Sequence, residues 1–175
     1  MSDSPASEPT ADRTRLVLGG GAHVALGPAP AAAVGLDVTA ELANHRWSIG
    51  LEGRYDLPAS APTTDGARSR ASLAGLQLVP CMHAQGMWAC AVVLVANLHA
   101  SAARAPEPSM RQDFLFVGLG ARLALHLSLP GDFALRVGGQ VLGHPVPVEL
   151  SRGESRLFKS PAVSATLGPA IVRVF

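Results

Sequence analysis

Charged residues are scarce in this chain, and the few present are balanced between the two signs. Of 175 residues, 14 are Lys or Arg and 13 are Asp or Glu, which gives a formal net charge of +1. Because the chain is not strongly basic and carries no run of like charges, we expect no nucleic-acid partner. A chain of this length is most simply one domain.

Long apolar runs are also missing. The longest, Ala89–Ala96, falls far short of the roughly 18 residues that a membrane-spanning helix needs. Glycine and proline are plentiful instead, at 18 and 14 residues, which is atypical of a helical protein. An apolar chain without membrane helices or a charged surface indicates strands, with lipid as a candidate neighbour.

Alternation with a period of two residues is the dominant pattern. From Leu115 to Leu129 an apolar residue occupies every second position, while glycine, Arg122 and His126 lie between them. The stretch Val34–Leu42 alternates in the same way. Such alternation is the pattern of a β-strand with one apolar face.

Eight segments fit this pattern, and most are ten or more residues long, which suits a tilted strand that crosses a bilayer. The expected strands are Arg15–Leu26, Val34–Leu42, Trp47–Leu57, Arg70–Cys81, Met87–Ala100, Gln112–Leu129, Phe133–Pro145 and Lys159–Phe175. In Arg70–Cys81 the alternation is blurred, because four consecutive residues from Leu76 to Val79 do not alternate clearly.

The connections between these segments alternate between short and long. Three are expected to be tight turns, namely Asn44–Arg46, Met82–Gly86 and Pro130–Asp132. Three are expected to be long polar loops, namely Pro58–Ser69, Ser101–Arg111 and Val146–Phe158, while the connection around Gly27–Ala33 is intermediate. Short turns at one rim and long loops at the other are typical of a transmembrane barrel.

The aromatic residues lie near the ends of the expected strands. Rings of this kind favour the interface between membrane and water, so we expect two girdles. The expected interface residues are Trp47, Tyr55, Trp88, Phe133 and Phe175. Phe114, Phe116 and Phe158 fall toward the long-loop rim, although Phe114 and Phe116 share the parity of Arg122. The alternative is that the aromatics cap the core of a soluble protein.

The sequence therefore predicts an all-β fold: an eight-stranded antiparallel up-and-down transmembrane β-barrel over residues 15–175, with short periplasmic turns and longer extracellular loops. Residues 1–14 are expected to be a disordered polar leader. The residues expected to face lipid are Val34, Leu36, Val38, Ile49, Leu51, Leu119, Leu123, Leu125 and Val137. The opposite face carries the charges expected to pair across a narrow, plugged lumen: Asp37, Glu41, Glu52, Arg54, Arg122 and Arg136.

Together with the ending "GPAIVRVF", these features resemble the small eight-stranded outer-membrane barrels of Gram-negative bacteria, of the OmpA/OmpX type, and the Ala/Gly/Pro-rich style is similar to barrel domains of myxobacterial proteins. The resemblance implies location in the outer membrane, contact with its lipid, a monomer, and recognition of the last strand by the barrel-assembly machinery. Ile171 and Phe175 match that assembly signal, whereas Arg173 departs from it. The leader has no apolar segment typical of a secretory signal, so we expect a trimmed start or a piece of a larger precursor.

The chain has two cysteines, Cys81 and Cys90, which flank an expected turn. Antiparallel pairing of the flanking strands would bring them opposite each other, so we expect a disulfide in an oxidising compartment. The alternatives are two buried free thiols, or a metal site that would add His83 but lacks a fourth ligand.

The expected function is a structural, scaffolding or narrow-pore role, without cofactor or metal. The alternatives are a soluble lipocalin-like barrel that binds an apolar ligand, and a lipid-modifying enzyme of the outer membrane. We expect no enzyme, because no catalytic motif accompanies the histidines. His99 near Ser101, or His144 near Ser151, could form a dyad at the long-loop rim, but such proximity arises easily by chance.

Overall fold

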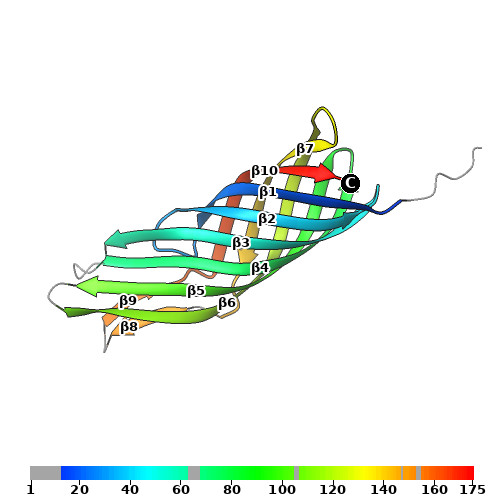
Figure 1. Ribbon diagram of the computed structural model, residues 1–175. Coiled ribbons are helices and arrows are strands. Elements are labelled where there is room, and N and C mark those ends of the chain that lie inside the picture. Colours follow the sequence, from blue (N-terminus) through cyan, green and yellow to red (C-terminus); the bar gives the residue numbers. More distant parts are fainter. Residues whose placement is uncertain (1–12, 63–67, 105–106, 147, 153–154) are drawn as a thin grey trace, which may run out of the picture.

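The chain folds into a closed barrel with one small additional hairpin (Figure 1). The computed structural model describes residues 13–62, 68–104, 107–146, 148–152 and 155–175. No helix in this described part is long and apolar enough to span a bilayer. The strands are β1 (Arg15–Leu26), β2 (Ala33–Ala43), β3 (Trp47–Pro62), β4 (Arg68–Ala84), β5 (Met87–Arg104), β6 (Glu107–Ser128), β7 (Phe133–Gly143), β8 (Glu149–Arg152), β9 (Ser155–Lys159) and β10 (Val163–Val174).

The barrel closes because β1 pairs on both of its edges. It lies antiparallel to β2 and to β10, so that Val17 is opposite Glu41 on one side and Val174 on the other. The strand order around the barrel is β1-β10-β7-β6-β5-β4-β3-β2. Each of the eight barrel strands therefore has a hydrogen-bonded neighbour on both edges, and the predicted eight-stranded up-and-down barrel is confirmed.

The short turns have the residues that their geometry requires. Asn44 accepts hydrogen bonds on Oδ1 from the backbone amides of Arg46 and Trp47, both at 2.9 Å. Between β4 and β5, Gln85 and Gly86 have φ of 49° and 80°, the left-handed values of a type I′ hairpin. The three short turns and the two ends of the barrel sheet, Arg15 and Val174, lie at one rim, and we call it the short-turn rim.

At the opposite, long-loop rim, the strands run further than the sequence predicts. Strands β3, β4, β5 and β6 have 16, 17, 18 and 22 residues, and Figure 1 shows them reaching together beyond the rest of the barrel. Much of the expected loops Pro58–Ser69 and Ser101–Arg111 is therefore strand, and Val146–Phe158 contains the hairpin β8–β9. The prediction was wrong here because it relied on apolar alternation. Polar residues can pair as strands once the sheet leaves the bilayer.

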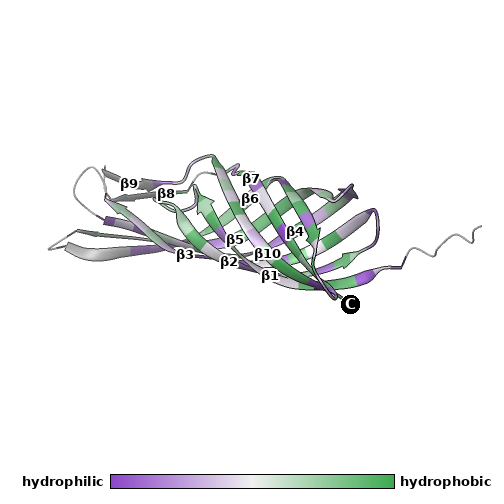
Figure 2. Ribbon diagram, turned by 90° about the horizontal axis from the view of Figure 1, so that it is seen from above, coloured by the Kyte–Doolittle hydropathy of each residue, from purple (hydrophilic) through white to green (hydrophobic). Residues whose placement is uncertain are grey.

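The outer surface is apolar around the part of the barrel where all eight strands run together. Figure 2 shows hydrophobic residues gathered there and paler colours on the extension of β3–β6. The nine residues expected to face lipid are all exposed, from 39% for Val137 to 68% for Leu123, which confirms the predicted orientation. A surface of this kind is the face that a bilayer covers.

The interior has an apolar part as well as a polar part. The apolar part lies on β4–β7 toward the long-loop rim, and its largest side chains are at most 1% exposed: Leu73, Leu94, Leu98, Phe116 and Leu142. The sequence did not predict this cluster, because β5 is apolar on both faces and shows no alternation between Ala89 and Ala96. The charged part of the interior is therefore confined to the remaining wall and to the short-turn half.

If the apolar band faces lipid, a charge placed at its middle should be costly. We expect Leu123→Arg to lower the free energy of unfolding from lipid vesicles by about 2–4 kcal/mol, the range for arginine at the middle of a bilayer. The measurement is denaturant unfolding of the folded barrel in vesicles.

A matched control places the same residue outside the band. Ala103 is exposed on the extension of β5, and Ala103→Arg should change the unfolding free energy by less than about 1 kcal/mol. Equal effects of the two substitutions would contradict the membrane orientation of the barrel.

Candidate functional site

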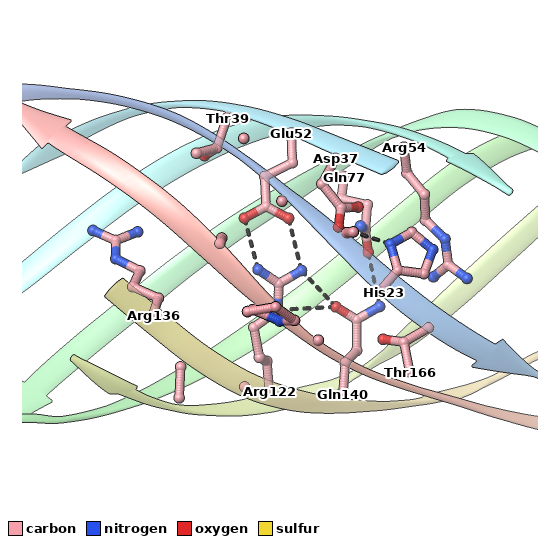
Figure 3. Close-up of a pocket in the computed structure, with 18 of the residues that line it drawn as sticks. His23, Asp37, Thr39, Glu52, Arg54, Gln77, Arg122, Arg136, Gln140 and Thr166 are labelled. Carbon is pink, nitrogen blue, oxygen red and sulfur yellow. Dashed lines mark hydrogen bonds and ion pairs between the residues drawn. The ribbon is translucent and has the colours of Figure 1, made fainter. Parts of the chain in front are cut away.

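A polar crossbar spans the middle of the lumen (Figure 3). The guanidinium of Arg122 donates to both carboxylate oxygens of Glu52, at 2.6 and 2.7 Å, and to Oε1 of Gln140. The amide of Gln140 in turn donates to Gln77 at 2.8 Å. Bidentate pairing of this kind satisfies groups that would be costly to bury alone.

The register explains why these four residues meet. Glu52 and Gln77 are direct partners on β3 and β4, and Arg122 and Gln140 are direct partners on β6 and β7. Because β3 and β7 lie on opposite sides of the eight-stranded barrel, the two hydrogen-bonded links tie opposite walls together. Side chains from both walls therefore meet across the lumen at this level.

A second ion pair lies nearer the short-turn rim. Nη1 of Arg136 on β7 is 2.6 Å from a carboxylate oxygen of Glu41 on β2, and both side chains are largely buried. The same guanidinium lies over the ring of Trp88, 3.6 Å from its centroid. Cation–π contact and ion pairing together fix this arginine in the lumen.

Trp88 corrects one prediction. Its ring is 9% exposed and lies inside the barrel, stacked on His83 at 3.8 Å and parallel to His126 at 5.2 Å. The placement at the membrane interface was wrong, because Trp88 shares the inward parity of Cys90. The other four expected interface aromatics are exposed: Trp47, Tyr55, Phe133 and Phe175. Phe116 is buried inside the barrel, and Phe158 falls on residues whose side chains are not described.

A third cluster surrounds His23, toward the long-loop rim. Its two ring nitrogens lie 2.8 Å from Asp37 and 2.7 Å from Asp56, and Arg54 makes two bonds of 2.8 Å to Asp56. Gly35 makes room for the ring, since a Cβ at that position would be 2.2 Å from His23 Nε2. Sequence reasoning missed His23 and Asp56; their inward parity was the available signal.

The structure thus brings together all six charged residues predicted for the lumen, in three levels. Glu41 pairs with Arg136, Glu52 with Arg122, and Asp37 and Arg54 meet through His23 and Asp56. The remaining cavity at the crossbar has a volume of about 80 Å³, enough for a few water molecules. A larger vestibule of about 780 Å³ lies at the short-turn rim, lined by Arg15, His83, Trp88 and Arg136 among others.

Cys81 and Cys90 are direct partners on β4 and β5 and form a disulfide, as predicted, with Cα atoms 4.0 Å apart. Both are buried on the lumen side of the wall. With both thiols oxidised, His83 makes other contacts: Nε2 bonds to the hydroxyl of Ser48 at 2.9 Å. Among the described residues, no group of three or more His, Cys, Asp or Glu is arranged to hold a metal ion.

His144 is locked in place between backbone and side-chain partners. Its Nε2 lies 2.7 Å from Ser164 Oγ and its Nδ1 3.0 Å from the carbonyl of Val117, while its ring packs against Phe116. Both His144 and Ser164 are buried, at 5% and 3% exposure. The predicted dyad with Ser151 involves a side chain outside those described, and the observed contacts of His144 are internal to the wall.

Comparison with solved structures decides the fold. The chain superimposes on Neisserial surface protein A with a TM-score of 0.58 at 10% identity, covering 91% of this chain and 97% of that one. The N-terminal β-barrel domain of Pseudomonas aeruginosa OprF gives 0.57 at 11% identity, with 93% and 100% covered. A major outer membrane protein from Thermus thermophilus gives 0.56 at 16% identity, also with 93% and 100% covered. The fold is that of the small outer-membrane barrels.

No protein-family model and no curated protein matches the barrel in sequence. At 10–16% identity these structural matches establish the fold and nothing further. Residues of the barrel must therefore be interpreted from their own geometry.

The last strand of the barrel carries the residues expected to serve assembly. Ile171 and Phe175 point outward and are 57% and 58% exposed. Arg173, which departs from the expected pattern, lies between Phe133 and Phe175, with its guanidinium 5.5 and 4.8 Å from the two ring centroids. Its aromatic neighbours give this arginine an interfacial position, where a charged head reaches water. The role of this strand in assembly remains a prediction.

The crossbar predicts a strong coupling between Glu52 and Arg122. We expect Arg122→Met to lower the free energy of unfolding by about 3–5 kcal/mol, because Glu52 is left in a buried position without its ion-pair partner. The double variant Arg122→Met/Glu52→Gln should recover most of that loss. The measurement is a double-mutant cycle by denaturant unfolding in vesicles.

Arg173→Met is the matched control, since it removes an arginine from the outer face and leaves every lumen pair intact. Its effect should stay below about 1 kcal/mol. If the losses of unfolding free energy from the two lumen substitutions were additive, Glu52 and Arg122 would not interact in the folded barrel.

Proposed function

We propose that this chain resides in the bacterial outer membrane as a closed-lumen barrel with a structural or scaffolding role. The shared fold supports the membrane location, and the band of outward leucine and valine supports it independently. A soluble lipocalin-like barrel would carry polar and charged side chains on its outer surface. Here Leu123 and Val38 are about two thirds exposed, at 68% and 67%. The observed exposure therefore argues against the soluble lipocalin-like barrel.

The single observation that carries the closed lumen is the crossbar. Four side chains from β3, β4, β6 and β7 bond to one another across the barrel, and only about 80 Å³ remains beside them. An ion that passed would have to break charge-assisted bonds in a low-dielectric interior. We therefore expect a plug, not a pore.

The apolar part of the interior closes the long-loop half in a second way. Leu94 and Leu98 are fully buried, and Phe116 packs with them in one cluster. A dry apolar filling offers no ligands to a hydrated ion. The glycines of the lumen wall, such as Gly21 and Gly138, line the small cavity and set its size.

The orientation follows from the layout of the connections. In barrels of this fold the short turns face the periplasm and the longer segments face outward. The extension of β3–β6 and the hairpin β8–β9 would then stand outside the cell, held by a barrel whose lumen is filled. With lipid covering its apolar band and the assembly machinery recognising β10, we expect the barrel to work as a monomer.

The test is planar-bilayer recording of the purified, folded barrel. We expect the unmutated protein to show no steady conductance, and Arg122→Ala to open a small leak because it removes the centre of the crossbar. Arg173→Ala, which lies outside the lumen, is the matched control and should not conduct. Each sample is first checked for heat-modifiable gel migration, so that only folded barrels are compared.

A large, steady, ion-selective conductance of the unmutated protein would contradict the closed lumen. It would leave the membrane location intact, since only an inserted barrel conducts. Extraction of the chain without detergent would contradict the location itself.

A further inference from the structure

Polar side chains lie in register on the outer wall just beyond the apolar band, and we call this group the polar grid. Register places Ser72 on β4 opposite His99 on β5, and His99 opposite Asp113 on β6. One level further from the band, Ser101 is flanked by Arg70 on β4 and Arg111 on β6. Serine, histidine and aspartate are thus neighbours on a single face, with two arginines beside them.

These side chains point outward. On β5 the residues of opposite parity, Leu98 and Ala100, are buried in the barrel, whereas His99 and Asp113 have side chains that are 51% and 66% exposed. Ser101 shares the outward parity of His99, because it lies two residues along the same strand. Nδ1 of His99 is hydrogen-bonded to Oδ1 of Asp113.

The depth of this grid relative to the membrane can be inferred from its neighbours. The adjacent level toward the apolar band runs from Tyr55 through Ala74 and Asn97 to Leu115. Tyr55 is an exposed aromatic of the kind that marks the interface, and Leu115 is 73% exposed. His99 therefore lies one level outside the apolar band, where the headgroups of the outer leaflet would be.

We propose that Ser101, His99 and Asp113 form an acyl-ester hydrolase site on the outer wall, which cleaves a carboxylic ester of a phosphorylated lipid. The proposal presumes the membrane location but does not depend on a closed lumen. Asp113 is a positioning residue: it holds Nδ1 of His99, so that Nε2 is left to act as a base.

The reaction needs only water as a second reactant. His99 takes the proton of the Ser101 hydroxyl while Oγ forms a bond to the ester carbonyl carbon. The tetrahedral intermediate then breaks its bond to the alcohol oxygen, which leaves with the proton from His99. Water, deprotonated by His99, attacks the acyl-enzyme; the fatty acid is released and Ser101 regains its proton.

The two arginines explain why Ser101 is the better nucleophile. Register places Arg70 and Arg111 on either side of Ser101, so that their guanidinium groups can reach a negative oxygen that develops there. Both arginines are exposed on the outer wall, where their guanidinium groups can reach a phosphate or an oxyanion. Ser72 lies directly across from His99 and is the competing candidate.

The contact between base and nucleophile needs a rearrangement of side chains. Within the part of the chain that the structure describes, no hydrogen bond joins His99 to Ser101 or to Ser72. A side-chain rotation is therefore required, as is common in active sites before substrate binds. The exposure of the grid also means that lipid headgroups, and not protein, would exclude water from the reaction.

The first experiment is covalent labelling of the folded, detergent-solubilised full chain with a fluorophosphonate probe, followed by mass spectrometry. We expect one adduct, on Ser101. The adduct should be lost in Ser101→Ala and His99→Ala and retained in Ser60→Ala, a nearby exposed serine. Labelling that Ser72→Ala abolishes and Ser101→Ala retains would overturn the choice of nucleophile.

The second experiment measures turnover with 4-nitrophenyl dodecanoate in detergent micelles. We expect His99→Ala and Ser101→Ala to reduce kcat by about 1,000-fold or more, as for other catalytic triads. Asp113→Asn should lower kcat while KM stays the same, in samples whose folded fraction, measured by heat-modifiable gel migration, equals that of the unmutated barrel. Identical residual activity in all these variants would show that the activity belongs to a contaminating esterase, and it would overturn the proposal. An unmutated barrel of proven fold that is inactive and unlabelled would overturn it as well.

The third experiment tests the substrate class. Arg70→Gln and Arg111→Gln should raise KM at least several-fold for a phosphorylated lipid and leave KM for the neutral ester unchanged. The kcat should fall for both substrates, because the arginines also face the developing oxyanion. Glycerophospholipid vesicles and a phosphorylated glycolipid of the outer leaflet are assayed separately, since both carry the chemistry that the arginines recognise. Equal changes in KM for the neutral and phosphorylated substrates would overturn the assignment of a phosphorylated substrate.

Discussion

The pairing of every backbone amide in a closed sheet is the constraint on which the rest of this structure depends. In the core of a bilayer no water satisfies an open strand edge, so β1 must find partners on both sides, in β2 and β10. Once the sheet is closed, side chains can only alternate between lipid and lumen. The leucines of β6 and the charges between them are two consequences of this single geometric rule.

A narrow lumen then decides which charges can be accommodated. An isolated carboxylate such as Glu52 would be costly to bury, and it is tolerated because Arg122 reaches it from the opposite wall with two hydrogen bonds. The same argument applies to Glu41 with Arg136 and to the two carboxylates around His23. The Arg122–Glu52 and Arg136–Glu41 pairs connect strands far apart in the sequence, and so they also oppose any other strand order or register.

The local sequence pattern was sufficient to predict the strands, but it was insufficient to predict which side chains contact one another in the lumen. The bounds of β1 and the outward direction of Leu123 follow from alternation alone, and the disulfide follows from two cysteines beside one turn. Trp88 could not be placed by its position near a strand end, because lipid-facing and lumen-facing positions there are one residue apart. The contact between His23 and Asp56, 33 residues apart, depends on a register that the sequence does not state. The extensions of β3–β6 were missed because strands outside the bilayer need no apolar face.

The alternation that gives the barrel an apolar outer surface also explains how reactive polar side chains can lie on that surface. Within the bilayer the outward positions of β5 and β6 must be apolar, as Val95 and Leu119 are. Where the two strands leave the bilayer that requirement ends, while the register continues unchanged through Asn97, His99 and Ser101. Proximity of His99 and Ser101 along one strand had little weight, since such pairs are common. Asp113 gives them weight: it lies 14 residues from His99 in the chain, yet the hairpin brings it to the adjacent position and to hydrogen-bonding contact. A rigid sheet held by lipid on one side of the interface can therefore hold polar groups in fixed order on the other, without a pocket.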